Sequence, residues 1–344
     1  MTDSLFQTQP QTEVPASNGN GASPEAKRSL RELADGEAFE LVFCVREREL
    51  RQKRDGEDFL KIVLADSTGS VPAICWEQAK ELFDISVPGS AVRVSGRFSV
   101  HARYGRQIKI SSIETAPEGS YDPADLAEGP PIPAERLEGD LRELIGTIQD
   151  TSLQQLLERF FGDGTEAWER FRAAPAAKFY HQAYVGGLLE HTLSVAQAVS
   201  AASAYFPGID RDVAVTGALL HDIGKLEAYN DEPMAIDLTD KGRLLGEIPL
   251  GYYKVRREIE EIDGFDPDTA QAVLHIILSH HGSLEHGSPV VPCTREATLV
   301  HTMDNLGGKL GSFDRLEREL ADGEAWSRFD RGLSASAYFG SRAA

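Results

Sequence analysis

The sequence has few cysteines, no long apolar run and no leader-like start. Three cysteines, Cys44, Cys75 and Cys293, are too few and too scattered for a disulfide framework or a zinc ribbon. The most apolar stretch, residues 213–220, is far shorter than the roughly 20 residues that a membrane-spanning helix needs. Residues 1–30 lack a basic segment followed by an apolar one, so no secretory signal is predicted. We therefore expect a cytoplasmic protein without a membrane partner.

The sequence is also poor in positive charge, with 35 Lys and Arg against 55 Asp and Glu and a formal net charge of -20. Because Lys and Arg drive phosphate binding, this balance argues against a nucleic-acid partner for the chain as a whole. The charge is unevenly distributed, however, since residues 38–115 carry nearly equal numbers of both signs. Residues 91–113 contain no acidic residue and hold Arg93, Arg97, Arg103, Arg106 and Lys109. This basic stripe predicts a nucleic-acid contact, and the alternative is the solvated strand faces of an ordinary β-domain.

Composition and periodicity divide the chain into four parts. Residues 1–30, rich in Gly, Ser, Pro, Gln and Asn, are predicted to be a disordered tail, and residues 117–133, dense in Pro, Gly and Asp, a linker. Residues 31–116 show strand patterns, whereas residues 134–344 show helix patterns. We expect two domains of different class, which a chain of 344 residues can hold.

The first domain is predicted to be a five-stranded OB-fold β-barrel. Strands are expected over residues 38–45, 59–65, 70–76, 91–100 and 106–113, with a short helix at 77–83 between the third and the fourth. Other small barrels can share this layout. An OB-fold commonly binds single-stranded nucleic acid along one face. The five basic residues named above are then candidates for phosphate contacts, and Trp76, Phe98 and Tyr104 for base stacking, with the barrel core as the alternative for each aromatic residue.

The second domain is predicted to be all-α. Helical patterns cover residues 137–148, 152–161, 184–205, 210–220, 252–262, 267–281 and 296–306. Eight of the nine histidines fall between His181 and His301, within these helices or next to them. Imidazole and carboxylate groups spread over several helices suit a site that holds a divalent ion between them.

The pair His221-Asp222 is the centre of this predicted metal site. Adjacent residues of these types can give a nitrogen and a carboxylate oxygen to one cation, and the carboxylate can bridge to a second. His191 and Asp304 are expected to complete the ligand set; the alternative is that all four are core histidines and helix caps. Lys225, three residues after Asp222, is expected to stabilise phosphate charge, with a solvated lysine at a helix end as the alternative. Asp222 and Lys225 are therefore the predicted catalytic residues.

The paired histidines His280 and His281 lie about 100° apart if they are helical. We therefore expect one of them to bind one metal and the other to serve a second metal or the scissile phosphate. Glu190 is expected to orient an imidazole, with direct ligation or a surface position as the alternatives.

The order His191, His221-Asp222 and Asp304 resembles the HD phosphohydrolase superfamily. More narrowly, the segments 186–195 (GGLLEHTLSV), 217–225 (GALLHDIGK), 239–246 (TDKGRLLG) and 278–297 (LSHHGSLEHGSPVVPCTREA) resemble the YhaM-type 3'-to-5' exoribonucleases. The resemblance extends over roughly residues 38–339 and implies an OB-fold followed by an HD domain. It also implies removal of nucleotides from the free 3' end of single-stranded RNA or DNA, supported by Mn²⁺, with Mg²⁺, Co²⁺ or Fe²⁺ as other ions, and a homo-oligomer.

One position departs from the family pattern. After Gly246 the family usually has a histidine, the expected ligand of a second metal, and this sequence has Glu247. A carboxylate still binds Mn²⁺ or Mg²⁺ and favours harder cations. We therefore expect Glu247 to be a metal ligand, with one ion or two in the site.

The function expected from these features is that of a metal-dependent 3'-to-5' exoribonuclease. One alternative is an HD-type nucleotidase or cyclic-nucleotide phosphodiesterase. The cyclic di-nucleotide class normally carries Gly-Tyr-Pro after its paired histidines, whereas this sequence has Gly287-Ser288-Pro289. The other alternative is a catalytically weak RNA-binding protein whose HD domain is structural.

Overall fold

The computed structural model describes residues 28–101, 105–127, 129–178, 182–232, 234–320 and 323–340. The strands are β1 (Ala38–Gln52), β2 (Asp58–Asp66), β3 (Gly69–Cys75), β4 (Ala91–His101), β5 (Gly105–Thr115), β6 (Trp326–Asp330) and β7 (Ala335–Tyr338). The helices are α1 (Ala79–Ile85), α2 (Ala134–Gly146), α3 (Thr151–Phe161), α4 (Glu166–Phe171), α5 (Gly187–Ser203), α6 (Arg211–Leu220), α7 (Lys225–Ala228), α8 (Asp240–Leu245), α9 (Glu247–Glu260), α10 (Pro267–Ser279) and α11 (Arg295–Glu319). Three short 3₁₀ turns, η1 (Leu30–Glu32), η2 (Pro123–Asp125) and η3 (Leu284–His286), connect them.

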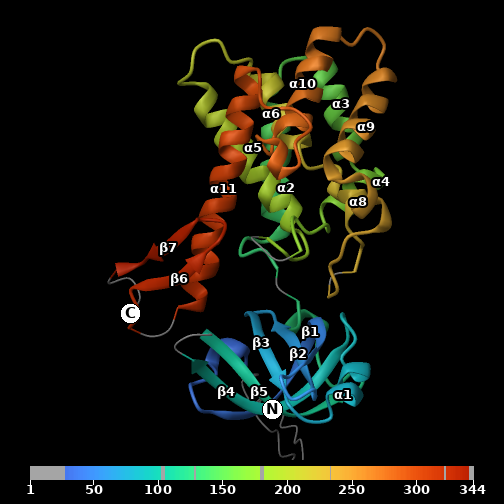
Figure 1. Cartoon of the computed structure of the whole chain (residues 1–344). Coiled ribbons are helices and arrows are strands. Elements are labelled where there is room, and N and C mark those ends of the chain that lie inside the picture. The colour runs from blue at the N-terminus through green and yellow to red at the C-terminus, as the bar shows by residue number, and fades with distance from the viewer. Residues whose placement is uncertain are drawn as a thin grey trace, which may run out of the picture.

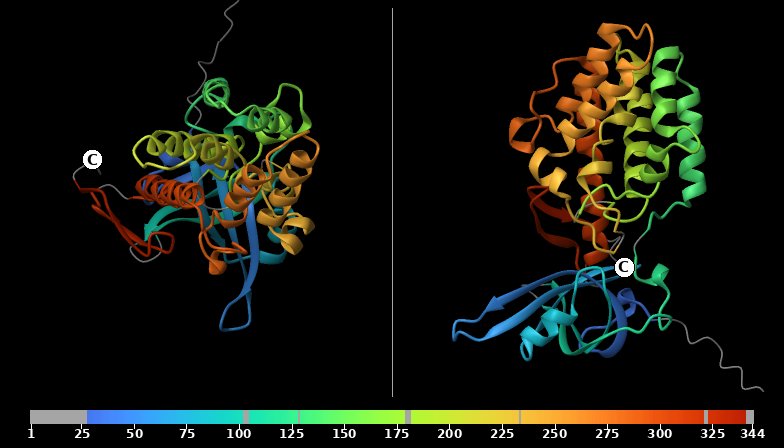
Figure 2. Two further views of the ribbon diagram at one scale, coloured as in Figure 1. Left: turned by 90° about the horizontal axis from the view of Figure 1, so that it is seen from above. Right: turned by 90° about the vertical axis from the view of Figure 1, so that its right-hand side faces the viewer.

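The first five strands close into a barrel in the order β1-β2-β3-β5-β4, which confirms the predicted OB-fold. All neighbours are antiparallel except β3 and β5. Inward-facing residues such as Phe43, Leu60, Ile62 and Phe98 are at most 1 % exposed and form the barrel core. β1 is longer than predicted, because residues 47–52 stay paired with β2 after a register shift at Arg46, and this hairpin projects from the domain (Figure 2).

The ends of the barrel domain pack more closely than the composition suggested. Of the tail expected over residues 1–30, residues 1–27 lie outside the described part of the chain. Leu30 is 2 % exposed within the barrel core. In the expected linker, Leu126 is also 2 % exposed and packs with Cys44 on the side of the barrel that meets Met234 of the helical domain.

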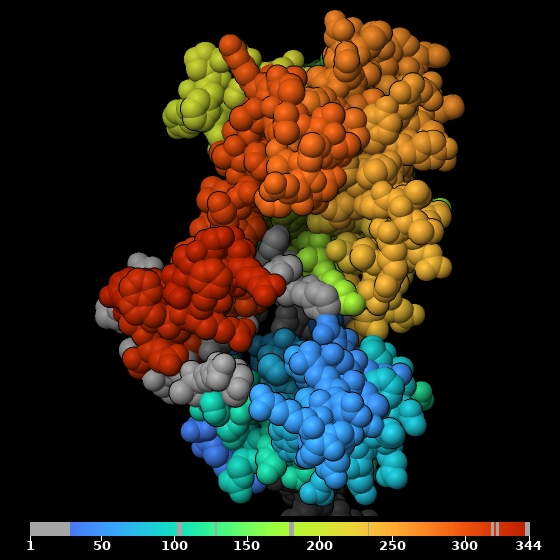
Figure 3. All heavy atoms as spheres, viewed as in Figure 1, coloured from blue at the N-terminus to red at the C-terminus, as the bar shows by residue number. Residues whose placement is uncertain are grey.

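The helical domain stands on the barrel and has a core of its own (Figure 1). α5, α6, α10 and α11 pack against one another at its centre. The expectation of an all-α domain was incomplete, because β6 and β7 form a hairpin after α11 that lies beside the barrel (Figures 1 and 3). The short helices α4, α7 and α8 were not predicted, and α11 continues to Glu319 rather than ending near residue 306.

In the described ranges no helix is long and apolar enough to cross a membrane.

Candidate metal centre

Five helices and the turns that end two of them bring the predicted ligands together. His191 lies in the second turn of α5, Asp304 within α11, and Glu247 opens α9, while the pairs His221-Asp222 and His280-His281 follow the last turns of α6 and α10. All of these residues except Asp304 lie at or near a helix end, where several elements converge. All seven predicted metal ligands therefore lie in one cluster.

The first ligand group surrounds His191. Its Nε2 atom lies 3.1 Å from Oδ1 of Asp304, 3.3 Å from Oδ2 of Asp222 and 3.3 Å from Nε2 of His221. His191, His221 and Asp222 each offer one ligand atom, and these three atoms lie within 4.8 Å of one another. This spacing suits a metal ion. Each of these three residues is at most 3 % exposed.

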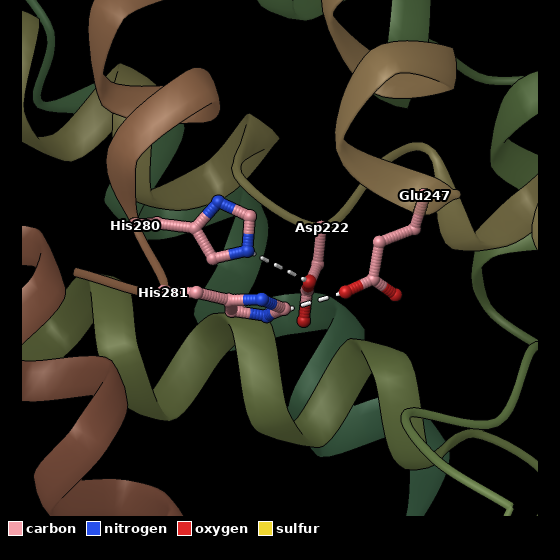
Figure 4. A group of neighbouring side chains, drawn as sticks. All are labelled: Asp222, Glu247, His280 and His281. Atoms are coloured by element: carbon pink, nitrogen blue, oxygen red, sulfur yellow. Dashed lines mark ion pairs between the residues drawn. The ribbon is translucent and has the colours of Figure 1, made fainter. Parts of the chain in front are cut away.

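The second ligand group combines Asp222 with Glu247, His280 and His281 (Figure 4). Oε1 of Glu247 lies 3.2 Å from Nε2 of His281, and Oδ1 of Asp222 lies 3.6 Å from Nε2 of His280. In Figure 4 the four side chains point toward one another from α9, α10 and the turn after α6. Again one ligand atom from each residue falls within 4.8 Å of the others.

Asp222 belongs to both groups and turns one oxygen toward each. Oδ2 faces His191 and His221, whereas Oδ1 faces His280. A carboxylate in this position can bridge two cations, as two-metal hydrolytic sites require. The geometry therefore fits two ions as well as one.

Backbone carbonyls set the orientation of three of the imidazoles. Nδ1 of His221 lies 2.6 Å from the Ala218 carbonyl, and Nδ1 of His280 lies 2.8 Å from the Ile277 carbonyl. His281 makes the same contact with the carbonyl of His286 at 2.9 Å. Since a carbonyl oxygen only accepts, Nδ1 carries the proton and Nε2 presents its lone pair to the cluster.

Opposing charges set the protonation of the first group. Burial opposes a positive charge on the His191 imidazole, but hydrogen bonds to Asp222 and Asp304 outweigh it and raise its pKa to about 9. Burial would raise the pKa of Asp222, yet Lys225 and the neighbouring imidazoles hold it well below its usual range. The pKa of Asp304 is likewise held low despite burial, chiefly by its hydrogen bond to His191. Both carboxylates are therefore anionic at neutral pH.

Lys225 contributes positive charge at the edge of the cluster. Its Nζ donates to Oδ2 of Asp222 at 2.7 Å. Burial lowers the pKa of Lys225, but the carboxylates of Asp222 and Glu247 raise it above its usual value, so the ammonium stays charged. The pKa of Glu247 falls despite burial, mainly because Lys225 lies nearby. Burial also lowers the pKa of His280, which keeps that imidazole neutral, as a metal ligand must be.

Two buried atoms of the cluster lack any hydrogen-bond partner within the described part of the chain: Oδ1 of Asp222 and Nε2 of His280. An unpartnered buried polar atom costs free energy, so such atoms call for an explanation. A divalent cation between them satisfies both at once. The residues present therefore fit a divalent metal, with the nitrogen and oxygen donors that such ions prefer.

The remaining histidines and Glu190 have other contacts. His275 accepts from the backbone N–H of Cys293 at 2.9 Å, and Nδ1 of His301 lies 2.7 Å from the His280 carbonyl, so His301 steadies the turn that carries a predicted ligand. Glu190 was expected to orient an imidazole; its carboxylate instead accepts a hydrogen bond from the Tyr184 hydroxyl. His181 lies outside the described residues.

The nucleic-acid candidates of the barrel differ in their surroundings. Arg97 and Lys109 are exposed and pair across β4 and β5. Arg93 is partly exposed and lies 3.6 Å from Glu40. Arg106 donates to the Leu30 carbonyl at 3.0 Å and lies over the ring of the buried Phe98, so it ties η1 to the barrel. Arg103 and Tyr104 lie outside the described residues.

Trp76 is 43 % exposed and has a partner that the sequence did not reveal. Its ring stacks on Phe59 with centroids 4.9 Å apart, and Lys53 Nζ lies 5.7 Å from the Trp76 centroid. The pairing of β2 with β3 brings the two rings together, because Phe59 is near the start of β2, Trp76 directly follows β3, and their neighbours Leu60 and Cys75 are paired.

Comparison with known families agrees with this architecture. The family model described as HD domain matches residues 188–308, and the one described as OB-fold nucleic acid binding domain matches residues 45–116. Together with the histidine and aspartate cluster, these matches define an HD-type phosphohydrolase of the metal-dependent kind joined to a nucleic-acid-binding barrel.

Relatives that match this chain over most of their length narrow the class of phosphohydrolase. The 3'-5' exoribonuclease YhaM of Geobacillus sp. (strain WCH70) is 30% identical over 295 residues, which cover 85% of this chain and 89% of the relative. YhaM of Bacillus subtilis (strain 168) is 32% identical over 277 residues, covering 80% and 86%. Among solved structures, the second OB-fold domain of replication protein A from Methanococcus maripaludis is 22% identical and covers 28% of this chain and 98% of that one; its TM-score of 0.22 is too low to support an argument. The chain belongs to the YhaM family of 3'-5' exoribonucleases.

Proposed function

We propose that this chain removes nucleotides one at a time from the free 3' end of single-stranded RNA by metal-dependent hydrolysis of the terminal phosphodiester bond. The observation that carries the proposal is Asp222, whose two oxygens face two separate ligand groups. Bound divalent ions would lower the pKa of water and neutralise the charge that develops on the phosphate.

The protein's own residues would hold and complement these ions. His191, His221 and Asp304 would hold one, Glu247, His280 and His281 the other, with Asp222 shared. Lys225 stays charged beside Asp222 and would stabilise the phosphate from the edge of the site. Mn²⁺ is the proposed ion, because the donors mix imidazole nitrogen with carboxylate oxygen, and Glu247 adds a hard ligand.

The barrel would bind the same RNA strand through stacking and charge. On its outer face Lys61 pairs with Ile74, Ile74 with Lys109, and Lys109 with Arg97, so one row crosses four strands. The stacked pair of Phe59 and Trp76 lies next to this row, since each is two residues from a member of it. Aromatic rings that stack on bases beside a row of basic side chains are typical of single-strand binding on OB-folds. Glu49, which pairs with Lys61, ends the row on β1.

A test of the barrel's role compares Trp76→Ala with the wild type on a long single-stranded RNA and on a small phosphodiester. Loss of one stacking ring typically costs about 1–3 kcal/mol of binding, so KM for the RNA should rise about five- to a hundred-fold. Hydrolysis of bis(4-nitrophenyl) phosphate should stay unchanged, because that substrate needs only the metal centre. Equal losses on both substrates would count against a separate role for the barrel.

The activity itself is tested with a 5'-labelled single-stranded RNA, metal-stripped protein, and Asp222→Ala as the inactive variant. A ladder of products shortened from the 3' end, dependent on both Mn²⁺ and Asp222, is the expected result. Hydrolysis of mononucleotides or cyclic nucleotides alone would favour the nucleotidase or cyclic phosphodiesterase. RNA binding without turnover under any metal would favour the catalytically weak RNA-binding protein.

A further inference from the structure

A groove with a cavity volume of about 630 Å³ leads away from the metal centre between α5 and α11. His191 lies at its wall, and Gly129 and Pro131, which follow the barrel in sequence, line another part of it. The groove therefore begins at the proposed reaction centre and reaches the segment that joins the two domains. Of the predicted site residues, His191 and Glu190 belong to it.

The lining of this groove does not suit phosphate groups. No Lys or Arg is among the described residues that line it, whereas Glu190, Asp314 and Glu317 contribute carboxylates. Because phosphates bind mainly through cations, an RNA strand would keep its phosphates away from these walls. Apolar side chains such as Leu306 and Leu310, which are 46 % and 54 % exposed, offer flat contact area for bases instead.

Glu190 is the polar group of the groove closest in sequence to the metal ligands. The hydroxyl of Tyr184, a residue that is only 8 % exposed, donates a hydrogen bond to one of its oxygens. This contact holds the carboxylate in the wall of the groove that His191 also lines. An ionised carboxylate accepts several hydrogen bonds, and a sugar hydroxyl is a donor of the right kind.

We propose that this groove binds the ribose and base side of the RNA nucleotides next to the scissile phosphate, and that Glu190, held by Tyr184, accepts a hydrogen bond from a ribose 2'-hydroxyl. The inference rests on the proposed exonuclease function and adds the basis for choosing RNA over DNA. The 2'-hydroxyl is the group by which a protein distinguishes the two at a given nucleotide.

The test uses RNA oligonucleotides in which a single 2'-deoxynucleotide is placed at successive positions from the 3' end. With the full-length wild-type protein, kcat/KM for the step at one position should fall about ten- to a hundred-fold, as expected for loss of a hydrogen bond to a charged acceptor. Uniform rates at every position would overturn the proposal.

Three variants connect the position at which the deoxynucleotide slows hydrolysis to Glu190 and Tyr184. In Glu190→Ala the rate on all-ribose RNA should drop to the rate on the deoxy-substituted RNA, so the difference between the two substrates disappears. Glu190→Gln should keep part of the difference because its amide oxygen still accepts, and Tyr184→Phe should reduce it. An undiminished difference in Glu190→Ala would contradict the assignment.

A filling variant tests the groove independently of hydrogen bonding. A Cβ added at Gly307 would meet only Val195, at 4.0 Å, so Gly307→Leu should extend into the groove without disturbing α11. Gly139→Leu is the matched control, because Gly139 lies in helix α2, away from the groove, with nothing within 4 Å of its added Cβ. RNA hydrolysis should fall at least about tenfold in Gly307→Leu only, whereas equal rates in both variants would contradict an RNA path through the groove.

Hydrolysis of bis(4-nitrophenyl) phosphate separates this inference from the proposed function. It should remain unchanged in Gly307→Leu and Gly139→Leu, because neither position contributes a side chain to the metal centre. If the wild-type protein fails to shorten RNA from the 3' end, the proposed function has failed. If it shortens RNA and DNA at the same rate, the function stands and the inference about the groove has failed.

Discussion

Asp222 is the residue on which both ligand groups depend. Its carboxylate is 2 % exposed, contacts two imidazoles and Lys225, and turns its other oxygen toward His280. We expect Asp222→Asn to lower kcat/KM for RNA by more than about a hundred-fold, beyond what removal of a group that merely supports a metal ligand costs. Discontinuous assays at saturating Mn²⁺ measure this; a loss under tenfold would contradict the bridging role.

Asp222→Asn should also lower the free energy of unfolding of the metal-free protein. Removing one partner of a buried ion pair typically costs about 3–5 kcal/mol, because the other charge is left uncompensated. Here Glu247 also faces Lys225, so we expect the lower end, about 3 kcal/mol. Denaturation by urea in the presence of a chelator measures the free energy of unfolding, with Asp263→Asn, an exposed position after α9 that also loses one negative charge, as the charge control.

Glu247 should determine whether a second ion binds tightly and which metal it is. In Glu247→Ala we expect the number of Mn²⁺ ions bound tightly per chain to fall from two to one, since the second group loses one of its four ligands. Glu247→His, which restores the residue usual in the family, should bring back the second ion and shift preference from Mg²⁺ toward Co²⁺. Titration calorimetry gives the stoichiometry; two tight ions in Glu247→Ala would exclude Glu247 as a ligand.

At the residue scale the predicted ligands lie together in one cluster, whereas the contacts of their neighbours could not be predicted from the sequence. His221, Asp222 and Lys225 lie within five residues of the chain, so a local pattern suffices to connect them. The contact between Glu190 and Tyr184 crosses the turn before α5, and the stack of Phe59 on Trp76 depends on strand register. Neither follows from residue type or spacing.

At the scale of elements, the metal centre depends on how closely α7 packs against α9. A Cβ at Gly224 would lie 2.0 Å from the Glu247 carbonyl oxygen and 2.6 Å from the Gly251 nitrogen. These are backbone atoms, so the contact cannot be relieved by rotating a side chain. The glycine of the HDIGK segment therefore allows the helix that carries Glu247 to reach the cluster.

We expect Gly224→Ala to force α9 away and to affect the second ligand group selectively. Overpacking typically costs about 1–3 kcal/mol, which lowers Tm by several degrees in a domain of this size. Affinity for the second Mn²⁺ should weaken at least about tenfold, whereas the first, held by His191 and His221, should change little. Gly139→Ala is the control, because Gly139 lies in helix α2 and an added Cβ there has nothing within 4 Å. Equal effects on both ions would contradict this account.

The pattern of elements that sequence analysis predicted and missed has physical causes. The barrel strands alternate buried and exposed residues, so their periodicity was visible. Residues 46–52 extend β1 with polar side chains on both faces, which hides the alternation. α7 and α8 have four and six residues, too few for a helical period, and Pro249 in the first turn of α9 concealed that helix's start. β6 and β7 are short and mostly exposed, so no core-facing pattern marks them.

At the scale of the whole molecule, a loop of the helical domain that contains Met234 and Ala235 contacts the barrel. Sγ of Cys44 on β1 lies 3.3 Å from the Met234 carbonyl, and Met234 packs on the small cluster of Cys44, Ala91 and Leu126. A Cβ at Gly89 would lie 2.9 Å from Cβ of Ala235. Cys44 is fully buried, so its thiol reports whether this junction is closed.

Burial raises the pKa of the Cys44 thiol to about 11. A raised thiol pKa means that the neutral form persists until high pH, so at pH 8 only about one thousandth of Cys44 is the reactive thiolate. Exposed Cys293 should therefore react first with Ellman's reagent, and Cys44 slowly. In a Cys293→Ser background, Ala235→Glu should open the junction and speed the labelling of Cys44 at least about tenfold. Cys75, buried inside the barrel, is the internal control and should stay slow. Equal acceleration of both thiols would indicate unfolding of the barrel, and no acceleration would show that the loop at Met234 does not hold the two domains together.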